Sequence, residues 1–376
     1  MKLKDLSVNI FSGGTPSTTN EDFWNGEFYW LSSGETKNTY IRETEKTITK
    51  LGVEKSSTRL AKVGDVVIAS AGQGKTRGQV AYCLTDTYIN QSIIAIRTKE
   101  ELLNSKFLFY NLASRYNELR LLSDSSSSRG SLTVKIFEEL DINLPKIENQ
   151  KKIAKVLSNY DDLIENNNKR IKILEEMAQK IYKEWFVDFK FPNHETATFK
   201  QTDLGSEVMP KKGKNITKAT IKEGNVPVVA GGIEPAYYHN VPNTVAPVIT
   251  ISASGANAGY INLYYQDIWA SDCSYIDTTM THYVYYYYLL LKYNQIKVTN
   301  MQRGAAQPHV YPQDLAQLKI KIPEEKVIGK FNEIITPFFS EISNLSLKNQ
   351  TLKQTRDLLL PRLISGEIDV ENMEII

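Results

Sequence analysis

The residues best suited to chemistry form a short run around Lys75. A Gly-Lys-Thr triplet that follows Ala69 after four residues nearly matches the phosphate-binding pattern GxxxxGK[ST], with alanine in place of the first glycine. Such a loop needs a helix N-terminus behind it, but residues 77–80 lead into another predicted strand. We therefore interpret the run as a hairpin loop that offers Lys75, Thr76 and Arg77 to DNA, through phosphate contacts or a guanine contact from the arginine. A nucleotide-binding enzyme built around Lys75 and Thr76, and a solvated surface loop, are the alternatives.

A serine-rich segment, residues 125–131, predicts a second polar loop, and residues 300–309 occupy the same slot in the second half of the chain. Serine, glutamine, asparagine and arginine are side chains that read or position DNA. Arg129 and Arg303 stand at matching positions, which favours a functional role over the alternative of plain linkers. The DNA-binding candidates in these loops are Ser128, Arg129, Ser131, Gln302, Arg303, Gln307 and His309.

Further candidates lie in the second half of the chain. Tyr237 and Tyr238 follow a Gly-Gly turn and are predicted at the surface, where they could contact DNA. Asn257 stands in the slot that the Lys75 loop occupies in the first half. The run of four tyrosines at 285–288 also suggests base stacking, but helical sequence continues on both sides, so we predict that it packs in a core.

Composition excludes several classes of protein. The 376 residues include 45 Lys+Arg and 43 Asp+Glu, which gives a net charge of +2. This balance excludes a polybasic arm or an acidic tail as the main means of binding a partner, although local basic patches remain compatible with it. A hydrophobic content of 41% excludes wholesale disorder. Two cysteines and four histidines, without metal-ligand spacing, exclude a disulfide framework and a structural zinc set.

The same survey gives expectations for compartment and catalysis. The start of the sequence has no apolar stretch, so we expect no secretory signal. The longest apolar run, residues 284–291, is far shorter than the ~20 residues of a membrane span. We therefore expect a protein of the reducing cytoplasm. The sequence contains no recognisable motif for adenine methylation, S-adenosylmethionine binding or nuclease chemistry, which favours a non-catalytic role.

The sequence repeats itself once, at about half its length, with a drifting offset that indicates insertions and deletions within a shared plan. Each repeat predicts a strand-rich module with one short helix, closed by a proline-bearing strand and followed by a helical arm. Corresponding segments are 26–34 and 224–232, 129–130 and 303–304, and 144–145 and 322–323. Predicted strands cover 63–70, 79–84, 92–97, 139–145, 245–252, 260–264 and 318–323, and predicted short helices cover 105–114 and 281–292.

In the arms after Pro145 and Pro323, apolar residues recur at the spacing of a helix with one wide apolar stripe. Proline fits the first position of a helix and breaks its interior. Pro337, with Thr336 as N-cap, therefore predicts a short helix followed by a long one. The long helices are predicted at 159–188, beginning at Asn159, and at 337–365, each a rod of about 45 Å.

The order of the segments constrains how these rods can pack. The first leads from one module to the other and the second leaves the second module, so rods that pack together must run antiparallel. The alternative is that each stripe covers an ordinary core. Asn167 falls on the stripe where Leu345 falls in the other arm. It either fixes the register as a buried polar residue or faces solvent.

Two segments of the arms resemble the conserved regions of type I restriction–modification specificity subunits. They are residues 181–189 (IYKEWFVDF), followed by Phe191-Pro192, and residues 352–368 (LKQTRDLLLPRLISGEI). Residues 150–157 and the opening segment 12–16 are also similar to that family, so the resemblance covers essentially the full length. The second module departs from the family at 209–213, which lacks the usual tryptophan after the glycine and leaves its first strand in doubt.

The resemblance implies an α+β fold in which two strand-rich target-recognition domains are joined by two long antiparallel helices in a coiled-coil spacer. The recognition domains would be residues 1–145 and 191–322, and the helical regions residues 146–190 and 323–376. The resemblance adds Ser12 and Thr15 to the DNA-binding candidates. Residues expected to pack the helices or contact partner subunits are Trp185, Phe186, Leu359 and Leu363.

The resemblance also implies a non-catalytic protein. Each recognition domain would read one half of a bipartite, asymmetric target in double-stranded DNA, and the helices would dock two methyltransferase subunits. Restriction subunits that use ATP would join this core. No cofactor is expected in this chain, since S-adenosylmethionine, ATP and Mg would act in the partner subunits. An adaptor whose modules bind protein is the remaining rival.

Overall fold

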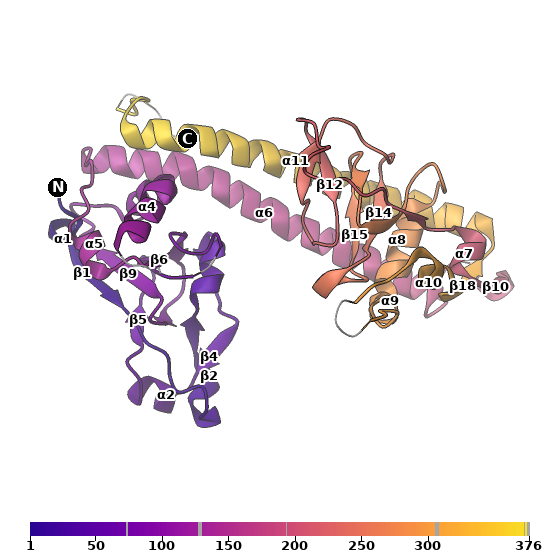
Figure 1. The fold of residues 1–376 in the computed structure, drawn as a ribbon, viewed down its shortest axis with the longest axis horizontal. Helices are drawn as coiled ribbons and strands as arrows, with labels where there is room; N and C mark the ends of the chain where they lie inside the picture. Colours follow the sequence, from indigo (N-terminus) through magenta and orange to yellow (C-terminus); the bar gives the residue numbers. More distant parts are fainter. Residues whose placement is uncertain (73, 127–129, 193, 305–307, 372, 374–376) are drawn as a thin grey trace. The chain divides into compact units, whose positions relative to one another are not determined.

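The computed structural model divides the chain into two compact units, residues 1–164 with 350–376 (unit 1) and residues 165–349 (unit 2). It describes every residue except 73, 127–129, 193, 305–307, 372 and 374–376. Each unit combines a strand-rich module with part of both long helices (Figure 1), and the four-part domain division stays a prediction. Within the described residues, no helix is both long and apolar enough to cross a membrane.

A five-stranded sheet in the order β1-β9-β6-β7-β3 forms the centre of module 1. Its middle strand, β6, is buried along its whole length, and alternate side chains enter two different cores, Val66 and Ile68 on one face and Val67 on the other. The predicted helix 105–114 is confirmed as α3, which packs on β6 and β7. The elements are α1 (Leu3–Leu6), β1 (Ser7–Ser12), β3 (Tyr40–Ile41), β6 (Val66–Ala69), β7 (Val80–Cys83), β9 (Ile93–Thr98), α3 (Ser105–Ser114), α4 (Tyr116–Ser126) and α5 (Val134–Glu138).

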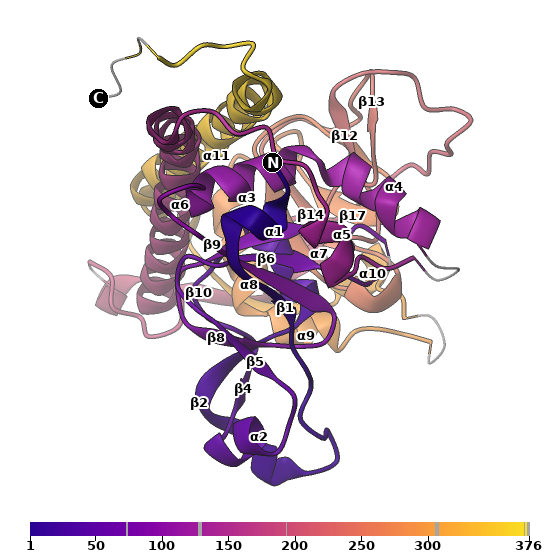
Figure 2. The same cartoon turned by 90° about the vertical axis from the view of Figure 1, so that its left-hand side faces the viewer.

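A second sheet of unit 1 has the order β4-β2-β8-β5. Figures 1 and 2 show β2, β4 and α2 at the end of module 1 that lies away from the long helix of the same unit. The elements are η1 (Glu21–Phe23), β2 (Trp24–Leu31), η2 (Ser33–Lys37), β4 (Lys46–Ile48), α2 (Lys50–Glu54), β5 (Arg59–Ala61) and β8 (Thr87–Ile89).

Unit 2 repeats this plan with one strand fewer in each sheet, in the orders β11-β17-β14-β15 and β13-β12-β16. Val66 faces Tyr82 in unit 1, as Val248 faces Tyr264 in unit 2. The doubtful first strand is β11, only two residues long and paired with β17. The elements are η3 (His194–Thr196), β10 (Phe199–Asp203), α7 (Leu204–Glu207), β11 (Lys211–Lys212), β12 (Val226–Val229), β13 (Tyr237–His239), β14 (Val248–Ser252), η4 (Gly255–Asn257), β15 (Ile261–Tyr264), β16 (Trp269–Ala270), β17 (Cys273–Ile276), α8 (Val284–Tyr293), α9 (Gln295–Thr299), α10 (Pro312–Ala316) and β18 (Lys319–Pro323).

Two glycines confirm the internal repeat at its largest offset. A Cβ on Gly26 would lie 2.6 Å from the carbonyl oxygen of Ile48, and a Cβ on Gly224 would lie 2.4 Å from that of His239. Both glycines therefore allow the same close approach of two hairpin strands, β2 to β4 and β12 to β13. The correspondence of 26–34 with 224–232 is thus a structural one.

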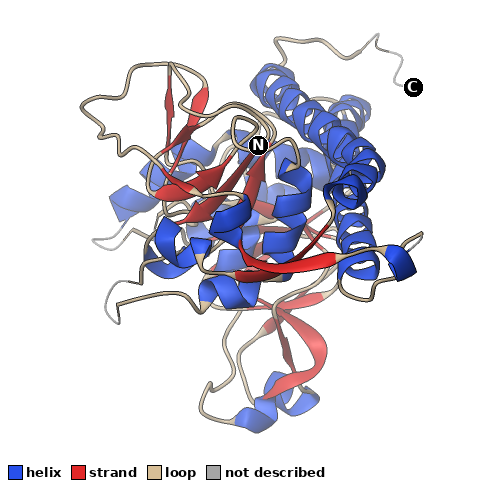
Figure 3. Cartoon of the chain, turned by 90° about the vertical axis from the view of Figure 1, so that its right-hand side faces the viewer, coloured by secondary structure: helices blue, strands red, loops and turns tan. Residues whose placement is uncertain are grey.

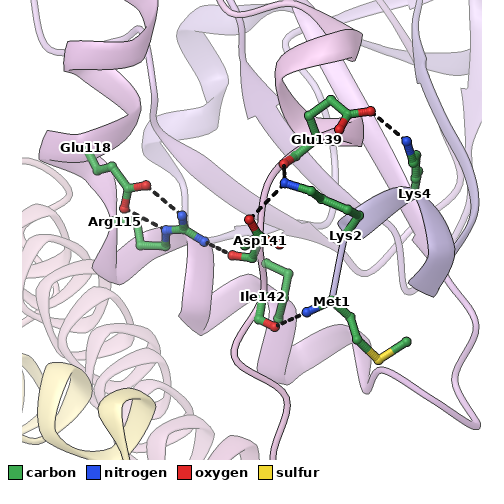
Figure 4. A network of polar contacts seen from close by, with 8 residues as sticks. All are labelled: Met1, Lys2, Lys4, Arg115, Glu118, Glu139, Asp141 and Ile142. Atoms are coloured by element: carbon green, nitrogen blue, oxygen red, sulfur yellow. Dashed lines mark hydrogen bonds and ion pairs between the residues drawn. The ribbon is translucent and has the colours of Figure 1, made fainter.

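The first residues of the chain lie beside residues 141–142 in unit 1, in the position that β10 takes beside β18 in unit 2. The amino group of Met1 donates to the Ile142 carbonyl at 3.1 Å, and Lys2 pairs with the Asp141 carboxylate at 2.8 Å (Figure 4). The predicted strand over 139–145 is wrong, because only an isolated bridge between Lys2 and Asp141 forms there. The chain turns into α1 after Lys2, so its partner segment is too short for a ladder.

Each arm is one continuous helix (Figure 3): α6 (Ile147–Phe186) and α11 (Glu325–Ser365). The predicted breaks before Asn159 and Pro337 are therefore wrong. Pro337 removes one backbone hydrogen bond, but it lies on the exposed face of the helix, where water can satisfy the freed carbonyl. Thr336 does not act as an N-cap, since its hydroxyl donates to the Asn332 carbonyl at 2.7 Å, as in a helix interior.

The two helices run antiparallel within each unit. In unit 2, Asn167 of α6 contacts Asn349 of α11, and Trp185 contacts Phe331 at 5.6 Å between ring centroids, so positions rise along one helix as they fall along the other. In unit 1, Arg356 of α11 pairs with Asp161 of α6. The predicted pairing of the arms is confirmed.

Asn167 is buried, with 9% of its surface exposed. Its amide donates to Asn349 Oδ1 at 2.9 Å, and the Asn349 amide donates to Asn168 Oδ1 at 2.8 Å. A buried asparagine whose hydrogen bond is satisfied in only one alignment favours that register over its neighbours. Of the two alternatives for Asn167, the structure shows the buried one.

Candidate nucleic-acid interface

Residues 70–79 join β6 to β7 as a hairpin loop. The Gly78 amide donates to the Ala69 carbonyl at 2.9 Å, and the Ala69 amide donates to the Gln79 carbonyl at 3.0 Å. Gly78 has a φ of +86°, a conformation that glycine adopts without strain. The described part of the segment leads into a strand and presents no helix N-terminus, so its geometry does not suit the phosphates of a nucleotide.

Helix α4 holds this loop through its backbone. The Tyr116 hydroxyl donates to the Lys75 carbonyl at 2.9 Å, and Arg120 Nη1 donates to the Gly74 carbonyl at 2.9 Å. The Lys75 side chain is exposed, and Thr76 is partly exposed. The loop therefore presents Lys75 to solvent from a fixed backbone, as the predicted DNA contact requires.

Arg77 takes a different place from the one predicted. It is buried, its Nη1 donates to the Gly130 carbonyl at 2.9 Å, and its Nη2 pairs with the Asp124 carboxylate. The expectation that Arg77 is offered to DNA is corrected, because the guanidinium faces inward and braces the loop against α4 and the segment that follows it.

We expect Arg77→Ala to loosen the hairpin loop. The change removes a buried cation from Asp124 and from the Gly130 carbonyl, and each lost charge-assisted hydrogen bond is worth about 1.5–3 kcal/mol. Amide hydrogen exchange should speed up in 70–79 and 130–132. Lys75→Ala is the matched control, since its exposed side chain does not hold the loop. Equal exchange in both variants would contradict the bracing role.

The second polar segment of unit 1 adjoins the hairpin loop. The Leu132 amide donates to the Ser70 carbonyl at 2.9 Å, and Ser131 beside it is partly exposed. Ser128 and Arg129 lie outside the described residues, so their predicted role stays a prediction.

The polar segment begins later than predicted. Ser125 and Ser126 belong to the end of α4 rather than to a loop. The helix extends this far because Leu119 and Ser123 are buried, and the Ser123 hydroxyl donates to the Arg120 carbonyl at 2.8 Å.

Ser12 and Thr15 lie at and just beyond the end of β1, and both are partly exposed. Ser12 pairs with Ile94 of β9, and the Thr15 hydroxyl donates to the Gln91 side chain. The next residue, Ser92, accepts from the Ser70 amide at 2.8 Å. Gln91 and Ser92 therefore link the end of β1 to the base of the hairpin loop.

Unit 2 brings together the corresponding loops. The Val310 amide donates to the Ala253 carbonyl at 2.9 Å, in the same way as Leu132 to Ser70 in unit 1. The side-chain amide of Gln302 donates from Nε2 to the Ala258 carbonyl at 2.8 Å, and Asn257 beside Ala258 is partly exposed. Residues 253–258 therefore form one surface with 302–304 and 308–310, whereas Gln307 lies outside the described residues.

Arg303 is the most clearly presented of the predicted residues. Its side chain is 67% exposed, and its Nη2 pairs with Asp314, whose side chain is only 7% exposed. Arg303 and His309 exchange both backbone hydrogen bonds, at 2.8 and 2.9 Å, and the His309 ring stacks on Tyr311 at 5.8 Å between centroids. A buried carboxylate thus orients an exposed guanidinium, the arrangement that favours bidentate recognition of guanine.

Sequence reasoning missed Asp314. Its carboxylate also accepts from the Tyr311 amide at 3.3 Å, near the start of α10. Pro312 at the first helical position with an acidic residue two positions later is a helix-start pattern that could have located it.

The hairpins of the second sheets carry aromatic side chains that are exposed in unit 2 and partly exposed in unit 1. Tyr237 and Tyr238 are exposed on β13, as predicted for the surface, and the Lys218 ammonium lies 5.5 Å from the Tyr237 ring centroid. In unit 1 the Lys46 ammonium lies 5.5 Å from the Trp24 ring. Sequence reasoning missed Trp24 and Lys46, although Phe23 and the turn pair Asn25-Gly26 on either side of Trp24 could have located the first of them.

The residues expected at helix interfaces pack within the chain. Phe186 is buried, and Trp185 lies 5.4 Å from Phe191 between ring centroids. Leu363 is buried in the core of unit 1, and Leu359 packs against it from a partly exposed position.

The tyrosine run at 285–288 is a core element, as predicted. Tyr286, Tyr287 and Tyr288 are buried, and Tyr285 stacks on Phe339 at 4.5 Å with an interplanar angle of 8°. Burial raises the pKa of Tyr287 to about 12, so its hydroxyl stays neutral at physiological pH.

The two thiols are unsuited to nucleophilic chemistry. Cys83 and Cys273 are both buried, and burial raises the pKa of Cys273 to about 12. Over the described ranges of the chain, no three His, Cys, Asp or Glu side chains gather as a metal-binding group.

Comparison with known proteins shows which family the sequence is similar to. Residues 1–176 and 193–354 match the family described as type I restriction modification DNA specificity domain. The chain is 27% identical to the type I restriction enzyme MjaIX specificity subunit of Methanocaldococcus jannaschii, over 99% of this chain and 94% of that protein. It is 29% identical to the EcoR124I/EcoR124II specificity subunit of Escherichia coli, over 50% of this chain and 47% of that protein.

The fold has a solved counterpart as well. The crystal structure of the type I restriction–modification S subunit from M. genitalium superposes with a TM-score of 0.61 at 19% identity, covering 96% of this chain and 95% of the other. The shared fold and the family match over most of the sequence show that this chain belongs to the type I restriction–modification DNA specificity family.

Proposed function

We propose that this chain is the DNA specificity subunit of a type I restriction–modification complex, and that each unit reads one half of a bipartite, asymmetric duplex target. One observation carries the proposal. In both units a hairpin loop meets a polar segment beside the central sheet, at 70–79 with 130–132 and at 253–258 with 302–304 and 308–310. Loops of unlike sequence at like positions suit two unlike half-sites.

The proposal assigns no catalysis and no cofactor to this chain. Two methyltransferase subunits would dock on α6 and α11, and ATP-using restriction subunits would join them in the cytoplasm. S-adenosylmethionine, ATP and Mg would act in those partners. Exposed apolar side chains support the docking: Ile173 and Met177 lie one turn apart on α6, and Leu358 is exposed on α11.

Selection from a random duplex pool tests the proposal against a protein-binding adaptor. The full chain is incubated with the pool, with and without the methyltransferase subunits, and bound duplexes are sequenced. We expect enrichment of two unlike short motifs with a fixed gap. A single continuous motif, or no enrichment with the partners present, would refute it.

A further inference from the structure

A cleft of about 550 Å³ opens in unit 1 beside the hairpin loop. The segment around Lys37, the hairpin loop at Lys75 and the α11 face at Lys353 and Arg356 form its sides, and residues of α3, α4 and α6 complete its lining. The size lies within the range of small-molecule sites, and the cleft adjoins the DNA-reading surface proposed for this unit.

The charges of the cleft are unbalanced. Four cations and two carboxylates line it, which leaves two net positive charges. Arg356 pairs with both carboxylates, Asp161 and Asp357. Lys37, Lys75 and Lys353 are exposed, and none of the three forms an ion pair with any residue that the structure describes.

The back wall of the cleft is fixed. Asp161 Oδ2 accepts from the Tyr110 hydroxyl at 2.6 Å and from the Tyr40 hydroxyl at 3.3 Å, while Oδ1 accepts from Arg356. Both oxygens of this carboxylate thus accept hydrogen bonds from side chains of the protein, and its charge is paired with Arg356. An anion in the cleft would therefore meet three available lysines without facing an unpaired carboxylate.

We propose that this cleft binds a phosphate group, held by Lys37, Lys75 and Lys353. Lysine ammoniums are strong partners for phosphate oxygens, and the fixed backbone of the hairpin loop holds the Lys75 stem in place. The phosphate comes from the DNA backbone or from a free nucleotide. Bound at Lys75 and Lys353 together, it links the hairpin loop to α11, so contact with DNA is transmitted to the helix.

The site belongs to unit 1 alone. At the repeat offset of 178, Lys353 corresponds to Glu175 on α6, which is partly buried near Lys292. The hairpin loop of unit 2 carries no lysine over 253–258. The backbone phosphates of the two half-sites are therefore bound differently.

The test uses the full chain with Lys37→Gln and Lys353→Gln combined. The matched control combines Lys180→Gln and Lys348→Gln, exposed lysines of α6 and α11 outside the cleft, with the same change of charge. Affinity for a 30-bp duplex of unrelated sequence is measured against salt concentration, and binding of inorganic phosphate and ATP is measured by calorimetry.

For the DNA source, which rests on the proposed function, we expect the slope of log K against log salt to fall in magnitude by about 1.8, or about 0.9 per lost contact, with no change in the control. If the duplex slope stays constant but the wild-type chain binds phosphate or ATP and the cleft variant does not, the source is a free nucleotide. Unchanged binding of duplex, phosphate and ATP overturns the site. Because the duplex is unrelated in sequence, this outcome is independent of the pool selection that tests the proposed function.

Discussion

Replacing Arg356 with alanine is expected to destabilise unit 1 by about 3–5 kcal/mol, because it leaves the Asp161 carboxylate buried without its cation. The Asp161 side chain is only 5% exposed, and its remaining partners are the Tyr110 and Tyr40 hydroxyls. Burial, and next the charge of Asp161, raise the pKa of Tyr110 far above its ordinary value. Tyr110 therefore stays protonated and continues to donate, but a hydroxyl carries no positive charge that could replace the lost guanidinium. The loss of stability is measured by urea denaturation, with amide hydrogen exchange in residues 1–164 as the readout.

Arg362→Ala is the matched control for this prediction. Arg362 lies on the same helix and pairs with Glu367, but both side chains are more than half exposed, and exposed pairs contribute about 0–1 kcal/mol. A double change, Asp161→Asn with Arg356→Met, should recover much of the stability, since it removes both charges. A loss of stability in Arg356→Ala no larger than that in Arg362→Ala would show that the buried pair of Arg356 and Asp161 does not stabilise unit 1.

Arg303→Ala is expected to relax discrimination at one base pair of one half-site. A bidentate arginine–guanine contact is worth about 1–3 kcal/mol of selectivity. The affinity ratio between the preferred base and its competitors should therefore fall roughly 5- to 150-fold. The other half-site should keep its sequence, because Arg303 and its partner Asp314 belong to unit 2 alone. Binding to a panel of duplexes with single-base changes in each half measures the effect.

Two variants sharpen this prediction. Asp314→Asn keeps the shape of the side chain but removes the charge that orients the guanidinium, so it should weaken the same base preference to a smaller degree. Arg170→Ala, which removes an exposed arginine of α6 paired with Glu341, should leave both half-sites intact. Loss of preference spread over both halves in Arg303→Ala would contradict the assignment of one half-site to each unit.

Local patterns in the sequence predicted much of the fold. Helix α3 spans its predicted range, and it begins at Ser105 because Asn104 caps the first turn by accepting from the Phe107 amide at 3.1 Å. The strands β6, β7, β9, β14 and β15 fall within or next to their predicted ranges, since each is a short apolar run between turn residues.

The errors arose where a local rule competes with packing across the chain. Pro337 was expected to begin a helix, but the apolar stripe continues through it, and Phe331 and Phe339 on either side are fully buried. Packing along the whole stripe outweighs the one hydrogen bond that proline removes, so α11 stays continuous.

The candidate site was predictable as segments and less so as individual contacts. Turn residues and the repeat locate the hairpin loops, but the inward turn of Arg77 depends on Asp124, 47 residues later. The cleft likewise depends on the pairing of Asp161 with Arg356, 195 residues apart. Nothing in the spacing of a single sequence marks partners so far apart.

If the proposed function holds, each unit reads its own half of a split target. This is tested by methylation mapping in a host that carries this chain with its methyltransferase partners, repeated with residues 253–258 and 300–310 exchanged for the loops of a related subunit. We expect a methylated motif of two unlike halves with a fixed gap, in which the exchange changes the sequence of one half and leaves the other half and the gap unchanged. A motif that changes in both halves, or in neither, would contradict it.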